Sequence, residues 1–397
     1  MSLGVYVSVP FCRAKCSFCN FASGVSTAER VAAYVRRLCA EIEDVGAKAA
    51  RLGVSLPRAV DTVYFGGGTP SLLETEQLRA IFAALRCRFD VARDAEITLE
   101  AAPGQIDEEL LEEALRLGVN RVSLGVQSFV DRESAAVGRT HTGDECLREI
   151  ARLRARGVAE VGADLIAGLP YQTRESWRMS LEAARAADLT HLSVYLLEID
   201  EGSRLGREVL GGGARMHAPA VASEELAAEL YEDACGFLEA RGLAQYEISN
   251  FARRAGANEG AHQARHNRKY WERAPYVGFG LDAHSMLLRA DGSAVRFANG
   301  DEIAEYEGGA GEKQVVEVGE REAFEESVFL GLRLNEGVAV GALRQRFART
   351  WVEDCEARVR ELAREGLMLI EDGRWRLTMR GRLVSSEVFG ELLAVGV

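Results

Sequence analysis

Short apolar runs alternate with longer amphipathic segments through the first half of the chain. Strands are predicted at residues 5–9, 62–65, 96–100, 121–126, 160–166 and 192–197. Helical patterns are predicted between them, at residues 28–52, 74–86, 107–117, 143–156 and 173–187. Strand–helix alternation at this spacing is typical of parallel strands joined by crossover helices. Six such units fall short of a closed eight-stranded barrel, so the pattern predicts an α/β fold built on a partial (βα)6 barrel.

The pattern changes after residue 200. Residues 202–219 contain three consecutive glycines and predict a mobile loop, which a helix at 222–241 is expected to follow. The next stretch, 245–299, is predicted to be irregular, aromatic and locally basic, and 308–311 to be a linker.

The C-terminal pattern differs again. Helices are predicted at residues 321–332, 340–347 and 352–365. Asp372-Gly373 then separates two β-rich runs, 367–371 and 374–378, which is a strong hairpin signal. Three helices and a hairpin predict a small α+β, winged-helix-like C-terminal domain with a packing or docking role.

These patterns divide the chain into three parts. Residues 1–241 form the predicted barrel, 242–311 the irregular segment with its linker, and 312–397 the winged-helix-like domain. A length of 397 residues suits this division, because one barrel takes about 200–250 residues and leaves room for a smaller domain.

Composition narrows the classes of function. A net charge of −13 argues against non-specific binding to nucleic acid or to anionic membranes. No apolar run reaches the roughly 18 residues that a membrane span needs, so no membrane insertion is expected. Residues 1–9 lack the pattern of a signal peptide, and the protein is therefore predicted to be cytoplasmic. Its eight cysteines are then not expected to form a disulfide framework.

Three of those cysteines lie within eight residues, directly after the first predicted strand. The motif is Cys12-Arg-Ala-Lys-Cys16-Ser-Phe-Cys19. Thiolates are the usual ligands of iron–sulfur clusters. Three ligands on a four-iron cube leave one iron open to chelate a small molecule through an amine and a carboxylate. A zinc site is the alternative, although a structural zinc site needs a fourth protein ligand, and the spacing favours the cluster.

The cysteine motif, its place after the first strand and the polar residues at later strand ends resemble the radical S-adenosylmethionine (SAM) superfamily. Within it, the chain is similar to the branch that contains oxygen-independent coproporphyrinogen III oxidases and HemW-type haem chaperones. The resemblance implies a [4Fe–4S] cluster on Cys12, Cys16 and Cys19, with SAM as a second cofactor. The general chemistry of the superfamily is reductive cleavage of SAM to a 5′-deoxyadenosyl radical. An electron donor for the cluster is therefore an expected partner if SAM is cleaved rather than only bound.

The SAM contacts that the resemblance implies follow the ends of successive predicted strands, where functional groups of parallel barrels collect. Carboxylates and an amide suit ribose hydroxyls and an ammonium group, and an arginine suits the methionine carboxylate. Three glycines before Thr69 allow the backbone to approach a ligand closely. The implied set is Tyr6, Phe18, Gly67, Gly68, Thr69, Glu100, Gln127, Arg139 and Asp164.

Two features separate the branches of the family. The oxidases carry a further cysteine two residues after the third ligand, where this chain has Phe21. They also have a long extension before the cluster strand, whereas Tyr6 is only the sixth residue here. The expected function is therefore a haem chaperone that delivers haem to haem-accepting proteins. The alternatives are an oxidase-like enzyme of porphyrin biosynthesis and a non-catalytic docking protein. Enzyme activity and a homodimer are left open.

A third feature points to haem as the cargo. The run from His266 to Trp271 matches the H-N-x-x-Y-W motif of HemW-type chaperones. Imidazole is a common axial ligand of haem iron, and the rings of Tyr270 and Trp271 offer flat surfaces to a porphyrin. Haem propionates require cationic partners, and the surrounding segment supplies Arg253, Arg254, Arg265, Arg268, Lys269 and Arg273.

Overall fold

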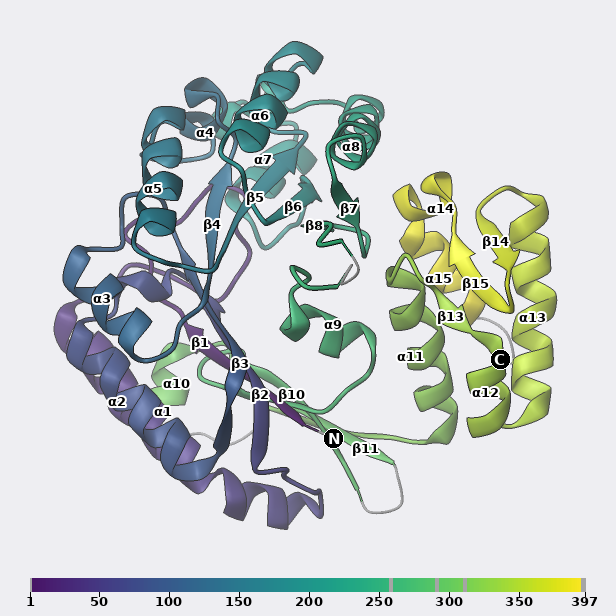
Figure 1. The fold of residues 1–397 in the computed structure, drawn as a ribbon, viewed down its shortest axis with the longest axis horizontal. Coiled ribbons are helices and arrows are strands. Elements are labelled where there is room, and N and C mark those ends of the chain that lie inside the picture. The colour runs from purple at the N-terminus through teal and green to yellow at the C-terminus, as the bar shows by residue number, and fades with distance from the viewer. Residues whose placement is uncertain (1, 257–259, 290–292, 310–312, 394–397) are drawn as a thin grey trace.

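The computed structural model describes residues 2–256, 260–289, 293–309 and 313–393. Six parallel strands lie side by side in chain order, as the alternating pattern predicts. They are β1 (Leu3–Val9), β2 (Ala59–Gly67), β3 (Asp90–Ala101), β4 (Arg121–Gln127), β5 (Glu160–Ala167) and β6 (His191–Leu196). Their crossover helices are α1 (Ala28–Leu52), α2 (Thr75–Arg88), α3 (Glu108–Arg116), α5 (Gly143–Ala155) and α6 (Arg174–Ala186). Figure 1 shows these helices along the outer side of the curved sheet, so the predicted partial barrel is confirmed.

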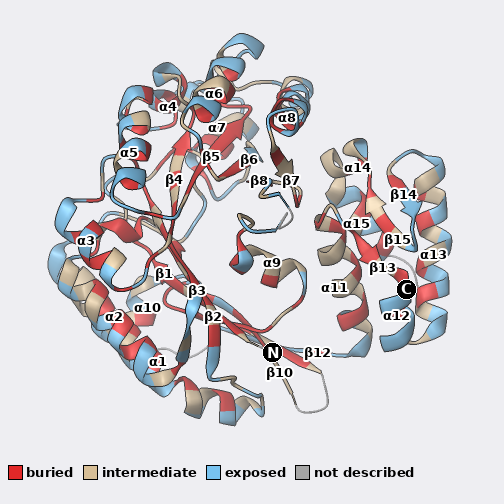
Figure 2. Ribbon diagram, in the orientation of Figure 1, coloured by how far each residue is buried: buried red, intermediate tan, exposed pale blue. Residues whose placement is uncertain are grey.

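The barrel core lies between the sheet and this outer layer of helices (Figure 2). Trp177 of α6 is fully buried there, and its indole N–H donates to the carbonyl of Leu230 at 2.7 Å. Leu230 belongs to α8 (Glu224–Glu239), so this bond ties the last barrel helices together. Thr27 caps the first turn of α1, and Gly53 ends that helix at φ 63°, a left-handed conformation that favours glycine.

Two segments of the prediction were wrong. The predicted loop at 202–219 contains α7 (Arg204–Leu210) and a 3₁₀ segment, Arg215–Ala220. The predicted irregular stretch at 245–299 adds short strands to both edges of the sheet. These strands are β7 (Leu243–Gln245), β8 (Asn250–Arg253), β9 (Tyr276–Phe279), β10 (His284–Leu288) and β11 (Ala294–Ala298), and β12 (Gln314–Val318) follows. Strands of three to five residues are too short to show a clear period in the sequence. Part of the predicted linker at 308–311 lies outside the described residues.

The sheet extension continues from β1. Strand β9 pairs in parallel with β1, and β10, β11 and β12 follow as antiparallel neighbours. Between β8 and β9 the chain forms α9 (Arg265–Trp271), and α10 (Ile303–Glu307) lies between β11 and β12. Figure 1 places α9 between the barrel and the C-terminal domain.

The C-terminal region has the predicted α+β composition. Its helices are α11 (Glu320–Arg333), α12 (Val340–Arg346), α13 (Arg349–Arg364), α14 (Met379–Leu383) and α15 (Ser385–Leu393). The hairpin of β14 (Met368–Glu371) and β15 (Arg374–Leu377) pairs with β13 (Val338–Ala339) as a small antiparallel sheet. Trp375 is fully buried at its centre. Of all the helices in the described part of the chain, none is long and apolar enough to cross a membrane.

Candidate functional site

The cysteine loop runs from the end of β1 to the start of α1 and is held by backbone hydrogen bonds on several sides. The Cys12 N–H donates to the carbonyl of Gly24 at 3.0 Å, which closes the loop on itself. Ser17 donates its N–H to the carbonyl of Val137 at 3.1 Å and accepts from the N–H of Leu205 in α7 at 2.8 Å. The segment predicted as a mobile loop thus helps to fix the cysteine loop in place.

All three thiols line one cavity of about 430 Å³ at the carboxyl ends of the barrel strands. Burial raises the pKa of the Cys16 thiol; Arg139 opposes this rise, while the neighbouring Cys19 and Cys12 add to it. The Thr69 hydroxyl donates to the sulfur of Cys12 at 3.7 Å. Among the described residues, no three His, Cys, Asp or Glu side chains are arranged around a single-ion position. A four-iron cluster binds each thiolate through a different iron and suits three thiols in one cavity, whereas a structural zinc site needs a fourth protein ligand.

The glycine turn after β2 supports the start of this loop. Gly68 donates its N–H to the carbonyl of Val9 at 2.9 Å, and Thr69 donates to that of Phe11 at 2.7 Å. A Cβ on Gly68 would lie 2.7 Å from backbone atoms of Phe11, so a side chain there would displace the loop. Gly67 has φ 100°, a conformation that other residues rarely adopt. The absence of side chains at these glycines allows the cysteine loop to approach closely, and it would allow a ligand to approach closely too.

Eight of the nine predicted SAM contacts line the cavity that the thiols share. They are Phe18, Gly67, Gly68, Thr69, Glu100, Gln127, Arg139 and Asp164. The ninth, Tyr6, lies on β1, where its hydroxyl faces the Cα of Gly67: a Cβ built there would be 3.4 Å away. The structure therefore brings the predicted set together around one cavity, of a size that is usual for small-molecule sites.

The charged groups of the cavity suit a ligand with both an anionic and a cationic end. Burial raises the pKa of Glu100 to about 7, with the nearby Asp164 raising it further and the hydroxyl of Tyr64 lowering it. Burial also raises the pKa of Asp164, against hydrogen bonds from Ser193 and Ser123. The Nε of Arg139 is buried without a hydrogen-bond partner among the described residues. A free buried guanidinium donor fits a carboxylate such as that of methionine.

Sequence reasoning missed several residues of this cavity. They include Ser123, Gly125, Ile166, Tyr195 and Leu197. Alternate residues of a strand point to the same face, and Ser123 and Gly125 precede Gln127 on β4 with that period. The same alternation relates Ile166 to Asp164 on β5. Counting every second residue along each predicted strand would therefore have identified these cavity positions.

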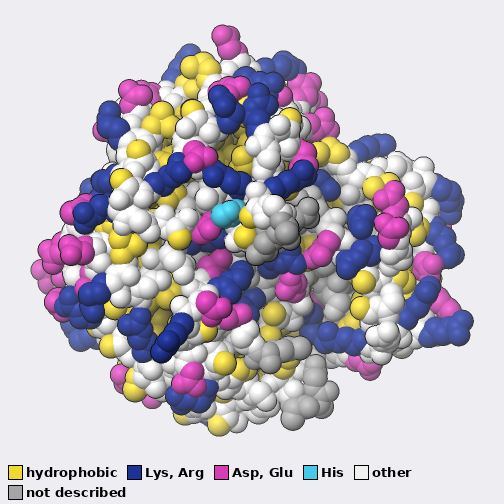
Figure 3. All heavy atoms as spheres, in the orientation of Figure 1, with side chains coloured by type: hydrophobic (Ala, Val, Ile, Leu, Met, Phe, Trp, Pro, Cys, Tyr) yellow, Lys and Arg dark blue, Asp and Glu magenta, His cyan; other side chains and the backbone are white. Residues whose placement is uncertain are grey.

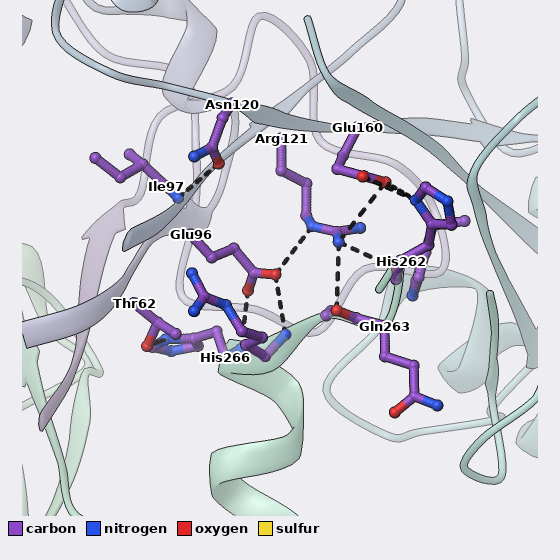
Figure 4. A network of polar contacts seen from close by, with 12 residues as sticks. Thr62, Glu96, Ile97, Asn120, Arg121, Glu160, His262, Gln263 and His266 are labelled. Atoms are coloured by element: carbon purple, nitrogen blue, oxygen red, sulfur yellow. Dashed lines mark hydrogen bonds and ion pairs between the residues drawn. The ribbon is translucent and has the colours of Figure 1, made fainter. Parts of the chain in front are cut away.

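The predicted haem-binding residues His266, Tyr270 and Trp271 lie on α9. This helix packs against the amino ends of the barrel strands, and Figure 4 shows its contacts there. Glu96 of β3 accepts the backbone N–H groups of Arg265 and His266, each at 2.9 Å, and thereby caps the helix. The same carboxylate accepts from buried Arg121 of β4 at 3.2 Å. Arg121 also donates to the carbonyls of His262 and Gln263. This network closes the end of the barrel opposite the cysteine loop.

The ring of His266 is enclosed in this arrangement. The residue is 1% exposed, its Nδ1 is hydrogen-bonded to the hydroxyl of Thr62 at 2.9 Å, and its Nε2 to that of Tyr270 at 2.9 Å. Burial lowers the pKa of His266 to about 3, so the imidazole is neutral. Trp271 is partly buried, and the guanidinium of Arg333 in α11 lies 4.1 Å from its ring centroid. Both ring nitrogens of His266 are thus engaged in the described conformation.

The basic residues around this segment do not form a free cationic patch, contrary to the expectation from sequence. Lys269 pairs with Asp61 at 2.8 Å, and Arg273 with Glu326 at 2.6 Å. The other four are bonded to acceptors as well: Arg253 to Asp188, Arg254 to Glu239, Arg265 to the carbonyl of Asp94, and Arg268 to Glu272 and Glu336. Figure 3 shows cationic and acidic side chains interspersed over this face. Several of the acidic partners lie more than 50 positions away in the sequence, so the sequence around this segment does not show that its basic residues are paired.

Known families and proteins match both the barrel and the C-terminal region of this chain. The radical SAM superfamily model matches residues 6–184, and the HemN C-terminal domain model matches residues 319–384. The heme chaperone HemW of Bacillus subtilis (strain 168) is 32% identical over 98% of each chain. The mitochondrial radical S-adenosyl methionine domain-containing protein 1 of Bos taurus is 31% identical over 98% of this chain and 87% of that protein.

One solved structure shares the complete architecture. Coproporphyrinogen III oxidase (HemN) from Escherichia coli superposes with a TM-score of 0.80, covering 99% of this chain and 90% of that chain at 24% identity. At 24% identity, this match shows a common fold. The family is shown by the HemW relatives, such as the one from Bacillus subtilis at 32% identity. The chain belongs to the HemW family of the radical SAM superfamily.

Proposed function

We propose that this protein is a haem chaperone that holds a [4Fe–4S] cluster, binds SAM beside it and delivers haem to haem proteins. The observation that carries the proposal is the 32% identity to a heme chaperone over 98% of both chains. Phe21 supports it, because this exposed phenylalanine stands where the oxidases of the family carry a further cysteine. An oxidase-like activity on coproporphyrinogen III is the alternative.

The residues of the cavity divide between the two cofactors. Cys12, Cys16 and Cys19 would hold the cluster, which when reduced supplies an electron for cleavage of bound SAM. Arg139 would bind the methionine carboxylate through its unpartnered Nε. Glu100 and Asp164 would bind polar and cationic groups of SAM, and Gly67 lines the same cavity.

Affinity for SAM should rise with pH between about 6 and 8. Glu100 titrates near 7; below that pH it is neutral and above it is charged, and only the carboxylate attracts the cationic ligand. Below its pKa, each unit of pH lost should weaken the Glu100 contribution by up to about tenfold. The Glu100→Gln variant should bind SAM weakly, and its SAM affinity should not show the rise with pH that Glu100 causes. Calorimetry on the reconstituted wild type and variant at several pH values measures the difference; identical pH profiles would contradict the role of Glu100.

For the haem itself, we propose α9 as the binding segment. Iron ligation by His266 then requires the ring to leave the hydroxyls of Thr62 and Tyr270, because both nitrogens are occupied. We expect His266→Ala to change the absorbance spectrum of bound haem. His217→Ala is the matched control, since His217 lies in the Arg215–Ala220 segment and is bonded to Tyr171. A haem titration followed by absorbance tests this, and a wild-type spectrum and affinity in His266→Ala would place haem elsewhere.

One assay separates the proposed function from its alternative. Anaerobically reconstituted protein is loaded with haem and mixed with an apo haem protein, and a parallel sample receives coproporphyrinogen III, SAM and a reductant. We expect transfer of haem in the first and no sustained decarboxylation in the second. Sustained turnover without haem transfer would assign the protein to the oxidases.

A further inference from the structure

Tyr64 of β2 joins two parts of the molecule that lie at opposite ends of the barrel. Its hydroxyl donates to Glu100 in the cofactor cavity at 2.6 Å. Its ring stacks on the imidazole of His266 in α9, with centroids 5.3 Å apart and planes inclined by 30°. Tyr6 lies beside it on the neighbouring strand β1, with ring centroids 6.1 Å apart. One side chain thus contacts both a proposed SAM ligand and the proposed haem segment.

The packing around Tyr64 links its position to that of Glu100. A Cβ on Gly66 would lie 3.0 Å from the Tyr64 ring and 3.1 Å from the Glu100 carboxyl, so both side chains press against this glycine. A second cavity of about 40 Å³ borders the same residues and reaches Asn267 of α9. The pair is therefore closely packed on one side and has room to shift on the other.

The contacts continue beyond His266 to the C-terminal domain. Its Nε2 is bonded to the hydroxyl of Tyr270, whose ring meets that of Tyr276 edge-on at 4.6 Å. The next residue, Trp271, lies under Arg333 of α11. A displacement of the His266 ring would change what the C-terminal domain packs against.

We propose that Tyr64 is a positioning residue that couples occupancy of the SAM pocket to the conformation of α9. The proposal rests on the proposed function in assuming that SAM binds at Glu100. A ligand that attracts the Glu100 carboxylate alters the hydrogen bond that holds Tyr64, and the Tyr64 ring transmits this to His266. Coupling of equilibria is reciprocal: if SAM shifts the conformation of α9, then whatever shifts that conformation, including a substitution at His266, also changes SAM affinity.

A double-mutant cycle on SAM affinity tests the coupling without haem. Tyr64→Phe keeps the ring and removes the bond to Glu100, and His266→Leu removes the stacked imidazole. We expect each variant to weaken SAM binding about fivefold, within the usual range of coupling, and the double variant to be no weaker than Tyr64→Phe alone. Independent, multiplying effects would overturn the proposal, as would wild-type affinity in His266→Leu.

A matched control lies on the same helix. The ammonium of Lys269 pairs with Asp61 and donates to the carbonyl of Ser2. Lys269→Met removes a buried contact of α9 as His266→Leu does, yet it should leave SAM affinity unchanged. A loss of affinity as large as that of His266→Leu would mean that any loosening of α9 acts on the pocket.

Hydrogen exchange with and without SAM gives a second measurement, in which each protein serves as its own reference. SAM should slow amide exchange across residues 265–271 in wild-type protein and leave it unchanged in Tyr64→Phe. Equal exchange with and without SAM in the wild type overturns the coupling. Failure of haem transfer with the coupling intact would remove the chaperone function alone, whereas absence of any SAM binding would remove both.

Discussion

Replacing Cys16 by serine is expected to yield a folded protein that keeps little iron after anaerobic reconstitution. Two thiolates cannot hold a four-iron cube, which needs at least three protein ligands here. The fold should survive, because backbone bonds from Gly24, Val137 and Leu205 hold the loop independently of the thiol. Iron and sulfide analysis with circular dichroism measures both outcomes.

The control for this experiment is a cysteine outside the loop. Cys39 lies partly buried on α1, and Cys39→Ser should reconstitute like the wild type. Full cluster content in Cys16→Ser, or equal loss in both variants, would contradict the assignment of the three cysteines as ligands.

Replacing Glu96 by alanine is expected to destabilise the protein by about 3 kcal/mol, the lower end of the cost of breaking a buried ion pair, because Glu160, 3.9 Å away, still compensates part of the Arg121 charge. Glu96 and Arg121 are both about 6% exposed, and their side chains meet at 3.2 Å. The variant also loses the acceptor for the first amides of α9. Denaturant unfolding of the cluster-free protein measures the change in free energy of unfolding.

An exposed ion pair supplies the comparison. Asp90 and Arg58 meet at 3.3 Å with more than half of each side chain accessible. Asp90→Ala should cost no more than about 1 kcal/mol, because solvent screens such a pair. Equal destabilisation by the two variants would mean that the network of Figure 4 does not close the barrel as described.

The sequence predicted the barrel well because its strands repeat one pattern. The predicted strand at 160–166 is observed as Glu160–Ala167, and the predicted helix at 28–52 as Ala28–Leu52. The convergence of polar residues could be predicted for the same reason: parallel strands all end at one edge, so residues such as Glu100 and Asp164 meet there. Their assignment to SAM came from the family resemblance and stays a prediction.

The environment of α9 could not be predicted in this way. The partners of His266 are Thr62, 204 positions earlier in the chain, and Tyr270, one turn later. A sequence window shows the nearby arginines and lysine but not Asp61 or Glu326, which pair with Lys269 and Arg273 after folding. The motif at 266–271 falls within helix α9, and the burial of its residues depends on contacts with distant strands. Its role in haem binding stays a prediction.

The hydrophobic core of the C-terminal region extends into the large sheet. Its buried cluster includes Tyr276, Met286 and Val318, which belong to strands β9, β10 and β12 of the large sheet. A chain cut before α11 would turn this apolar strip toward water, where exposed apolar patches promote self-association. Separating the two parts would therefore require polar replacements at Tyr276, Met286 and Val318, the strand residues that the C-terminal region covers.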